Sequence, residues 1–393
     1  MNKSPRHLLA FVVLYGIMFL LGYIVNIKGV SYPLINAEFA LSDDQQGMMV
    51  SLFGLSNVLF CFAGGILIGS IGVKKTLVAG FFFVVAGLAA VFFMPHFWSA
   101  TGALLIMFAG LGFFLVSSNA LAAQLFKARA ALLMTLLHFS FGVGSILSPR
   151  LAGALTVTLN WRYVYLLSIP LVLFLFILVL FARFPAGTQD TPAAKKVSFF
   201  TALKTPMVWI FAVVLGLMLV VEMSSASWAG LHFQNVYGLD PRTSGAAFLS
   251  NFFILFTLSR LLSGFVIEKI GYMRGLFIAA SATVFIFALG FSVGERGLYI
   301  LPALGFFTAL FFPITMVTAM GYFREHAPVM TSAVIVIAGA LNSGTQLLIG
   351  FTNRFAGPAW GYRSVLVYAV LVVVALVVLR RCLRQPYKGL GSS

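Results

Sequence analysis

Long apolar stretches separated by short polar segments run along the chain from residue 8 to residue 380. A helix needs about 20 mainly apolar residues to cross the hydrocarbon core of a bilayer. Twelve stretches reach that length, and we predict spans at 8–31, 46–70, 75–95, 99–125, 130–155, 162–184, 206–234, 244–268, 273–292, 297–322, 329–353 and 361–380. The pattern therefore predicts an all-α membrane protein with twelve transmembrane helices.

Composition excludes a soluble protein. Of 393 residues, 61% are hydrophobic and 9% are charged, whereas a soluble domain has about 25% charged residues. Two cysteines, Cys61 and Cys382, give no disulfide framework. The first apolar stretch lacks a small-residue cleavage pattern, so we interpret it as a retained helix rather than a signal peptide.

The net charge of +16 is an orientation signal rather than a nucleic-acid footprint. With the N-terminus inside, 17 of the 25 Lys and Arg residues fall in inner segments, six fall in outer segments, and Lys28 and Arg260 fall within helices. An excess of Lys and Arg marks the cytoplasmic side. We therefore expect a multi-pass protein of a bacterial-type inner (plasma) membrane, with both termini in the cytoplasm.

The chain divides into two similar halves. The longest polar stretch, residues 183–206, predicts a cytoplasmic linker at 185–205 between six-helix bundles at 1–184 and 206–393. Residues 47–75 align with 245–274 at an offset of 198, which becomes 199 after one gap. The aligned glycines are Gly47 with Gly245, Gly65 with Gly264, and Gly72 with Gly271. Duplicated halves of this kind place a substrate site near the membrane midplane between them.

The loop after the second span resembles the signature loop of the major facilitator superfamily, Gly-x-x-x-Asp-Arg-x-Gly-x-Lys/Arg-Lys/Arg. The first copy is Gly65, Gly69, Ser70, Gly72, Lys74 and Lys75, with Gly69 and Ser70 in place of the acid–base pair. The second copy is Gly264, Glu268, Lys269, Gly271 and Arg274. The resemblance implies two pseudo-symmetric six-helix bundles (the MFS fold) and a gating role for these loops, with a weaker latch in the first half.

Three stretches resemble the fucose and glucose proton-symporter branch of that superfamily. They are 30–56, with Pro33, Phe39, Gly47 and Ser51; 110–126, with Asn119; and 219–241, with Glu222 and Trp228. The branch's Asp in span one and Glu in span four are replaced here by Gly29 and Leu115. Only Asn119 and Glu222 are therefore carried over as functional residues.

Lys28 and Glu222 lie inside apolar stretches, and Glu222 is the only deep one of the nine acidic residues. A charge at the centre of a spanning helix costs about 2.5–3.5 kcal/mol. The repeat aligns Glu222 with Ile24, one turn from Lys28, so we expect both at one depth in one cavity. Our hypothesis is that they reach each other or one substrate, with proton coupling through Glu222. Two alternatives stay open: Lys28 snorkels outward, or it is a fixed countercharge.

Other polar residues in the spans are weaker candidates for substrate binding, each with packing or an interhelical hydrogen bond as the alternative. A break at "NIKG" would let Asn26 and Lys28 face the same cavity. Asn342 and Gln346 share a helix face. For Arg260 we favour a gating or structural role. For Arg150 we favour an outer-end position, with a position facing the cavity as the alternative if span five is shifted. The substrate-binding candidates are Lys28, Asn26, Asn119, His138, Trp228, Asn251, Asn342 and Gln346.

No metal-ligand spacing, nucleophile triad or phosphate-binding glycine loop stands out, so we expect neither an enzyme nor a bound metal or cofactor. We predict a monomeric secondary transporter in the lipid bilayer, moving a small polar solute (a sugar or polar organic molecule) by alternating access with protons as coupling ion. Efflux of drugs or metabolites, and transport of an organic anion anchored by Lys28, are the alternatives. A non-transporting receptor is disfavoured by the paired gating loops.

Overall fold

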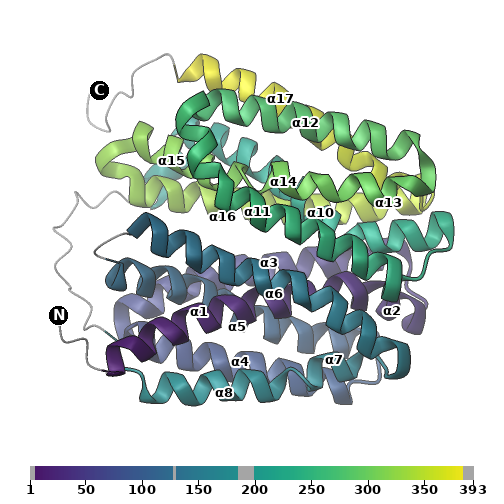
Figure 1. Cartoon of the computed structure of the whole chain (residues 1–393), viewed down its shortest axis with the longest axis horizontal. Coiled ribbons are helices and arrows are strands. Elements are labelled where there is room, and N and C mark those ends of the chain that lie inside the picture. Colours follow the sequence, from purple (N-terminus) through teal and green to yellow (C-terminus); the bar gives the residue numbers. More distant parts are fainter. Residues whose placement is uncertain (1–4, 127–129, 185–198, 384–393) are drawn as a thin grey trace.

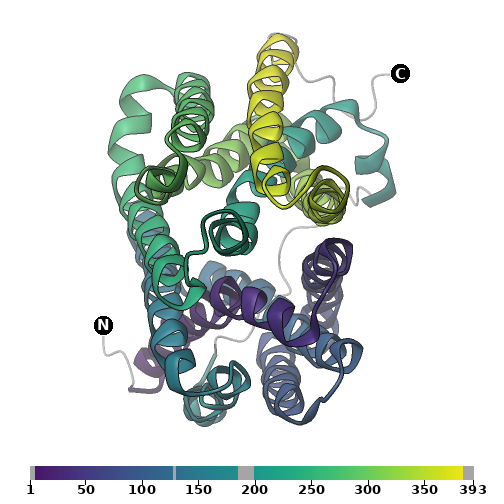
Figure 2. The ribbon, with the colours of Figure 1, turned by 90° about the vertical axis from the view of Figure 1, so that its right-hand side faces the viewer.

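The structure is a computed structural model that describes residues 5–126, 130–184 and 199–383. Within these ranges every regular element is a helix. The helices form two elongated bundles that lie side by side along the long axis of the molecule (Figure 1). The view from one end shows the two bundles as separate groups that meet along a central seam (Figure 2).

The first bundle contains the helices before residue 185. They are α1 (Pro5–Asn26), α2 (Lys28–Phe39), α3 (Asp43–Ile71), α4 (Val73–Phe93), α5 (Phe97–Leu125), α6 (Ala130–Thr158), α7 (Arg162–Leu166) and α8 (Ile169–Phe181). The predicted linker lies mostly outside the described residues. Its described end holds a short helix, α9 (Phe199–Leu203), which packs against the long helix α16 of the second bundle.

The second bundle contains eight α-helices and four short 3₁₀ or π turns. They are α10 (Pro206–Tyr237), η1 (Pro241–Gly245), α11 (Ala246–Ile270), α12 (Tyr272–Ser292), η2 (Gly294–Arg296), α13 (Gly297–Ile300), η3 (Leu301–Ala303), α14 (Leu304–Thr308), α15 (Phe311–Phe323), η4 (Arg324–His326), α16 (Ala327–Ala356) and α17 (Trp360–Cys382).

Eleven helical segments of the described chain are long and apolar enough to cross a membrane, each at a predicted span. The twelfth predicted span is α6, which has 29 residues and packs beside α1 and α11. The first span extends to Phe39, beyond the predicted end at residue 31. The prediction stopped early because Pro33 and polar neighbours interrupt the apolar run, whereas the helix resumes at Lys28 and contains Pro33.

The two aligned turns of the repeat have the same backbone conformation. Gly72, between α3 and α4, and Gly271, between α11 and α12, both have φ of +85°. Each glycine donates its backbone N–H to the carbonyl four residues earlier, which ends one helix as the next begins. Only glycine adopts this φ without strain, so the repeated glycines are explained by the turn itself.

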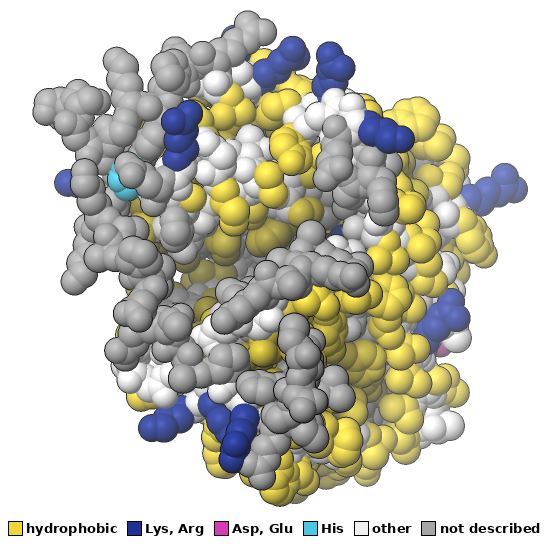
Figure 3. Space-filling view, turned by 60° about the vertical axis from the view of Figure 1, so that its left-hand side comes forward, with side chains coloured by type: hydrophobic (Ala, Val, Ile, Leu, Met, Phe, Trp, Pro, Cys, Tyr) yellow, Lys and Arg dark blue, Asp and Glu magenta, His cyan; other side chains and the backbone are white. Residues whose placement is uncertain are grey.

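We call the end at which α1 begins and α17 ends the inner end, because the basic residues predict that it faces the cytoplasm. Figure 3 brings this end forward and shows Lys and Arg side chains scattered around it, with hydrophobic side chains covering the flank. The opposite end, where α2 ends and α16 meets α17, is the outer end. These two names are used below.

Among the described residues, the bundles touch mainly through α3 with α16, α6 with α11, and α2 with α10, with further contacts of α2 and α6 with η1 and of α2 with α11. Backbone-to-backbone contacts between the bundles lie towards the outer end and involve glycine. A methyl group on Gly47 would lie 2.9 Å from the Cα of Gly350, and one on Gly230 would lie 3.1 Å from the carbonyl oxygen of Gly29. At the inner end, methyl groups on Gly65 or Gly69 would meet no described atom within 4 Å. Along α3, the described contacts with the second bundle are therefore close towards the outer end and absent at the two inner glycines.

Candidate functional site between the two bundles

Lys28 is the first residue of α2, directly after the break in the first span at Ile27. Pro33 explains the bend nearby, because its ring displaces the carbonyl of Gly29 and its nitrogen donates no hydrogen bond. The Lys28 side chain is only 8% exposed, and its Nζ lies 4.0 Å from the Sδ of Met223 on α10. The lysine thus points from the first bundle towards the second, rather than outward to the membrane surface.

Glu222 lies in the middle of α10 and is also 8% exposed. It forms no ion pair with Lys28, although the two side chains interact electrostatically. Glu222 also interacts electrostatically with Arg260 on α11. The structure therefore brings acid and base together at the seam as expected, but without direct contact and with a second cation beside the acid.

Arg260 was not among the predicted binding residues. Its guanidinium lies 4.4 Å from the ring centroid of Phe256, and its Nη1 is 3.3 Å from the Nδ1 of His138 on α6. The sequence signal was available, because Arg260 is the other basic residue placed inside an apolar stretch. The sequence alone did not tell which side of α11 the Arg260 side chain projects from. Here that side faces Glu222 and α6.

We call Lys28, His138, Glu222 and Arg260 the central cluster. Each bundle contributes two members, from α2 and α6 on one side and from α10 and α11 on the other. Buried charges are costly unless they are paired or hydrated. A cluster shared between bundles is therefore sensitive to any relative movement of the two halves.

Asn26 has a bonding role within the first bundle. Its Nδ2 donates to the carbonyl oxygen of Gly22 at 2.9 Å and to the Oγ of Ser145 on α6 at 3.0 Å. The break after Asn26 is present as the "NIKG" stretch suggested, but Asn26 is buried and holds α1 to α6. The geometry favours the interhelical alternative for this residue.

A hydrogen-bonded group joins α10 to α16 beside the central cluster. Trp228 is 1% exposed, and its Nε1 donates to the Oε1 of Gln346 at 2.8 Å. The Nε2 of Gln346 donates to the Oδ1 of Asn342 at 2.9 Å and to the Oγ of Ser224 at 3.2 Å. Asn342 and Gln346 share a helix face as expected. Trp228 and Gln346 are packed, which leaves half-buried Asn342 as the accessible end of the group.

Two candidates lie away from the cluster. Asn251 is exposed on α11, on the opposite side of the helix from Leu249, which packs against Gly29. Asn119 is exposed near the inner end of α5 and forms no side-chain hydrogen bond with the described residues. The neighbouring hydroxyls of Ser117 and Ser118 are fully buried and have no described partner. None of these residues is brought to Lys28 in this conformation.

The predicted gating loops lie at the inner end, and their described basic side chains form no hydrogen bond or ion pair with the described residues across the seam. Lys74 donates to the carbonyl oxygens of Leu180 at 2.8 Å and Ala182 at 2.9 Å, which closes the end of α8 in its own bundle. Lys75, Lys269 and Arg274 are exposed. The side chain of Glu268 and the surroundings of Gly264 lie outside the described residues. The gating role stays a prediction.

Comparison with known proteins places this geometry in a family. The family model described as Major Facilitator Superfamily matches residues 14–345. The chain belongs to this superfamily. It is therefore a transporter rather than an enzyme.

Several members of the superfamily resemble the chain along its whole length. The L-fucose-proton symporter of Escherichia coli (strain K12) is 22% identical, with 95% of this chain and 94% of that protein covered. A crystal structure of the E. coli fucose:proton symporter FucP matches with a TM-score of 0.68 at 16% identity, covering 97% of this chain and 100% of that one. The nucleoside transporter NupG matches with a TM-score of 0.79 at 13% identity, covering 95% and 99%. These structural matches establish the shared fold.

Proposed function

We propose that this member of the superfamily imports a small polar solute, a sugar or polar organic molecule, together with protons. It would act as a monomer with both termini in the cytoplasm. The halves at 1–184 and 206–393 would rock about the seam and expose the central cluster to each side in turn. The observation that carries the proposal is Glu222, a buried acid of the described residues, which interacts electrostatically with buried Lys28 and half-buried Arg260 at the seam between the two bundles.

Glu222 supplies the coupling in this proposal. As a carboxylate it attracts Arg260 from its own bundle and Lys28 from the other. Protonation removes that attraction and lowers the cost of moving the side chain through the membrane interior. A bound solute that takes over the hydrogen bonds of the cations would favour the protonated form. Proton and solute would then cross together.

The decisive experiment compares wild type with Glu222→Gln in proteoliposomes. A panel of neutral sugars, organic anions and cationic dyes is offered with and without an inward proton gradient. We expect gradient-driven accumulation of one solute class by wild type, and exchange without accumulation by Glu222→Gln. Normal accumulation by this variant would remove Glu222 from the coupling step. Release of dyes from preloaded vesicles would instead favour efflux.

A second candidate function is transport of an organic anion. It is favoured by the charges of the central cluster, in which Lys28 and Arg260 share one carboxylate. Lys28 also has only the Sδ of Met223 as a described hydrogen-bond partner. In this case Lys28→Ala should reduce uptake of carboxylate-bearing solutes far more than uptake of neutral sugars. Equal losses for both classes would assign Lys28 a structural role.

A further inference from the structure

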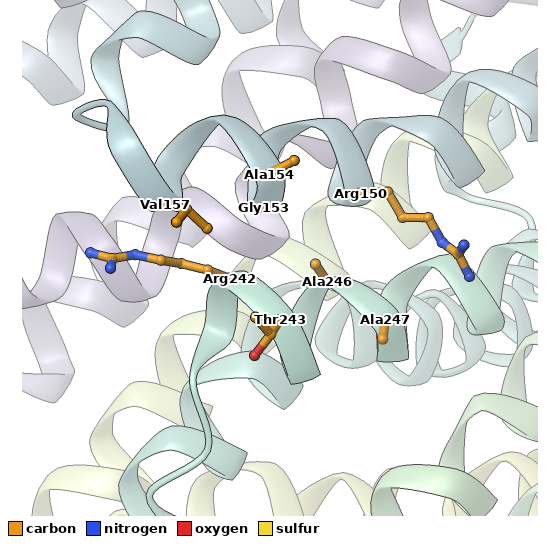
Figure 4. A pocket seen from close by; sticks show the side chains of 8 residues that line it. All are labelled: Arg150, Gly153, Ala154, Val157, Arg242, Thr243, Ala246 and Ala247. Carbon is orange, nitrogen blue, oxygen red and sulfur yellow. The ribbon is translucent and has the colours of Figure 1, made fainter.

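A crevice lies on the outer half of the seam, where α6 of the first bundle meets η1 and α11 of the second (Figure 4). It has a volume of about 330 Å³. Its floor is made of small residues: Gly153, Ala154, Ala246 and Ala247. A methyl group on Gly153 would overlap the carbonyl oxygen of Arg242, so the bundles touch backbone to backbone beneath the crevice.

Each bundle contributes one arginine to this crevice. Arg150 comes from α6 and Arg242 from η1, and their side chains extend towards opposite ends of it (Figure 4). Neither side chain forms a hydrogen bond or ion pair with the described residues. The crevice has no acidic lining residue. The carboxylate of the neighbouring Asp240 accepts a hydrogen bond from the backbone N–H of Arg242 at 2.8 Å, so this carboxylate caps the turn.

The surroundings of Arg150 are those of a lipid-facing surface. Arg150 projects away from the side of α6 on which Ser145 meets Asn26. Its exposed neighbours on α6 are Leu147, Leu151 and Val157. Arg150 lies eight residues before the end of α6 at Thr158, which is about 12 Å along the helix. A guanidinium at this depth is unfavourable in hydrocarbon unless an anion or water reaches it.

We propose that this crevice binds the phosphate of an anionic phospholipid from the leaflet at the outer end. Arginine binds phosphate through paired hydrogen bonds, and basic pockets between spanning helices recognise anionic headgroups. The exposed leucines below the crevice would contact an acyl chain. Because the walls of the crevice come from α6 of one bundle and from η1 and α11 of the other, a lipid bound in it stabilises the conformation in which the outer ends are together.

The test measures lipid binding to the purified full-length protein in detergent by native mass spectrometry and thermal unfolding. Phosphatidylglycerol is compared with phosphatidylcholine for wild type, Arg150→Gln and Arg242→Gln. The matched control is Arg296→Gln, which removes an exposed outer-end arginine of η2 away from the crevice. Soluble glycerol phosphate is tested in parallel, because it would bind to a simple phosphate site but not replace the lipid at a site that also holds the acyl chain.

We expect phosphatidylglycerol to bind and raise Tm in wild type and in Arg296→Gln. Its apparent affinity should fall about tenfold in each crevice variant, since a hydrogen bond to a charged group is lost. Equal binding by all four proteins, or equal effects of the two lipids, would overturn the proposal. So would an equal rise in Tm with glycerol phosphate. If Arg150→Gln fails to fold, Arg242→Gln at the exposed rim gives the same readout.

Discussion

The outer and inner parts of the seam are built from the same face of α3, yet they differ in contact. Gly47 and Gly54 lie on this face near the outer end, and Gly65 and Gly69 continue it inward. A methyl group on Gly54 would lie 2.6 Å from the Oγ of Ser343 on α16, whereas one on Gly65 would meet no described atom within 4 Å. All four glycines lie on the side of α3 that faces the seam, but in this conformation only the two outer ones, Gly47 and Gly54, are packed against α16.

The central cluster lies where the closed and open parts of the seam adjoin. Towards the inner end, methyl groups on Gly65, Gly69 and Gly72 of the first signature loop would meet no described atom within 4 Å. Towards the outer end, backbone-to-backbone contact and an ion pair between Asp44 and Arg354 join α3 to α16. Tight outer packing and loose inner packing are the arrangement expected of a carrier open to the inside.

The largest effect is expected from filling the outer contact. Gly47→Ala places a methyl group 2.9 Å from the Cα of Gly350 and 3.1 Å from the carbonyl oxygen of Gln346. Overpacking of this kind costs about 1–3 kcal/mol, which would shift the carrier away from the outer-closed state. Solute uptake by proteoliposomes should fall several-fold. The control Gly344→Ala, on α16 with no atom near the new methyl group, should transport normally; a similar loss in both would refute the contact argument.

The inner part of the seam is tested by labelling. A cysteine at Gly65 should react rapidly with a membrane-impermeant maleimide applied from the inner side, because the face towards α16 is open there. A cysteine at Gly54, on the same face but against Ser343, should react far more slowly. Both are made in a background with Cys61 and Cys382 replaced by serine. Comparable rates at both positions would mean that the seam is equally open along its length.

The two lysines of the first gating loop should differ in their effect on stability. Lys74→Gln removes the cation that closes the end of α8, and we expect a loss of about 1 kcal/mol in the free energy of unfolding. Lys75→Gln, at an exposed position, should change it by less than about 0.5 kcal/mol. Thermal unfolding in detergent measures both. Equal shifts would show that the bonds from Lys74 to Leu180 and Ala182 contribute nothing to stability.

The smallest effect is expected at the ion pair between Asp44 and Arg354, whose Oδ2 and Nη1 are 2.8 Å apart. Because the arginine side chain is 53% exposed, we expect only a weak coupling, since solvent screens an exposed ion pair. A double-mutant cycle with Asp44→Asn and Arg354→Gln at low and high salt measures it. A coupling that does not weaken as salt increases would contradict a surface ion pair.

The apolar pattern of the sequence predicted most of the fold, but it predicted less of the candidate site. The spans and the paired glycine turns were predicted closely because membrane thickness fixes helix length and a positive φ requires glycine. The grouping of Lys28 and Glu222 followed from the repeat. The sequence did not predict the place of Arg260 beside Glu222. It also did not predict that Trp228 is packed or that Asn251 is exposed. Each of these depends on which side of a helix faces the seam.

The sequence by itself determined that this is a membrane protein of two related six-helix halves, with a lone deep acid and few intramembrane bases. Those features depend on local composition and spacing. Only the tertiary structure decided which polar side chains meet and which part of the seam is closed. The physical reason is that lipid-facing and protein-facing sides of a spanning helix are both apolar. Hydrophobic periodicity therefore carries little information about rotation, and packing between the helices sets it.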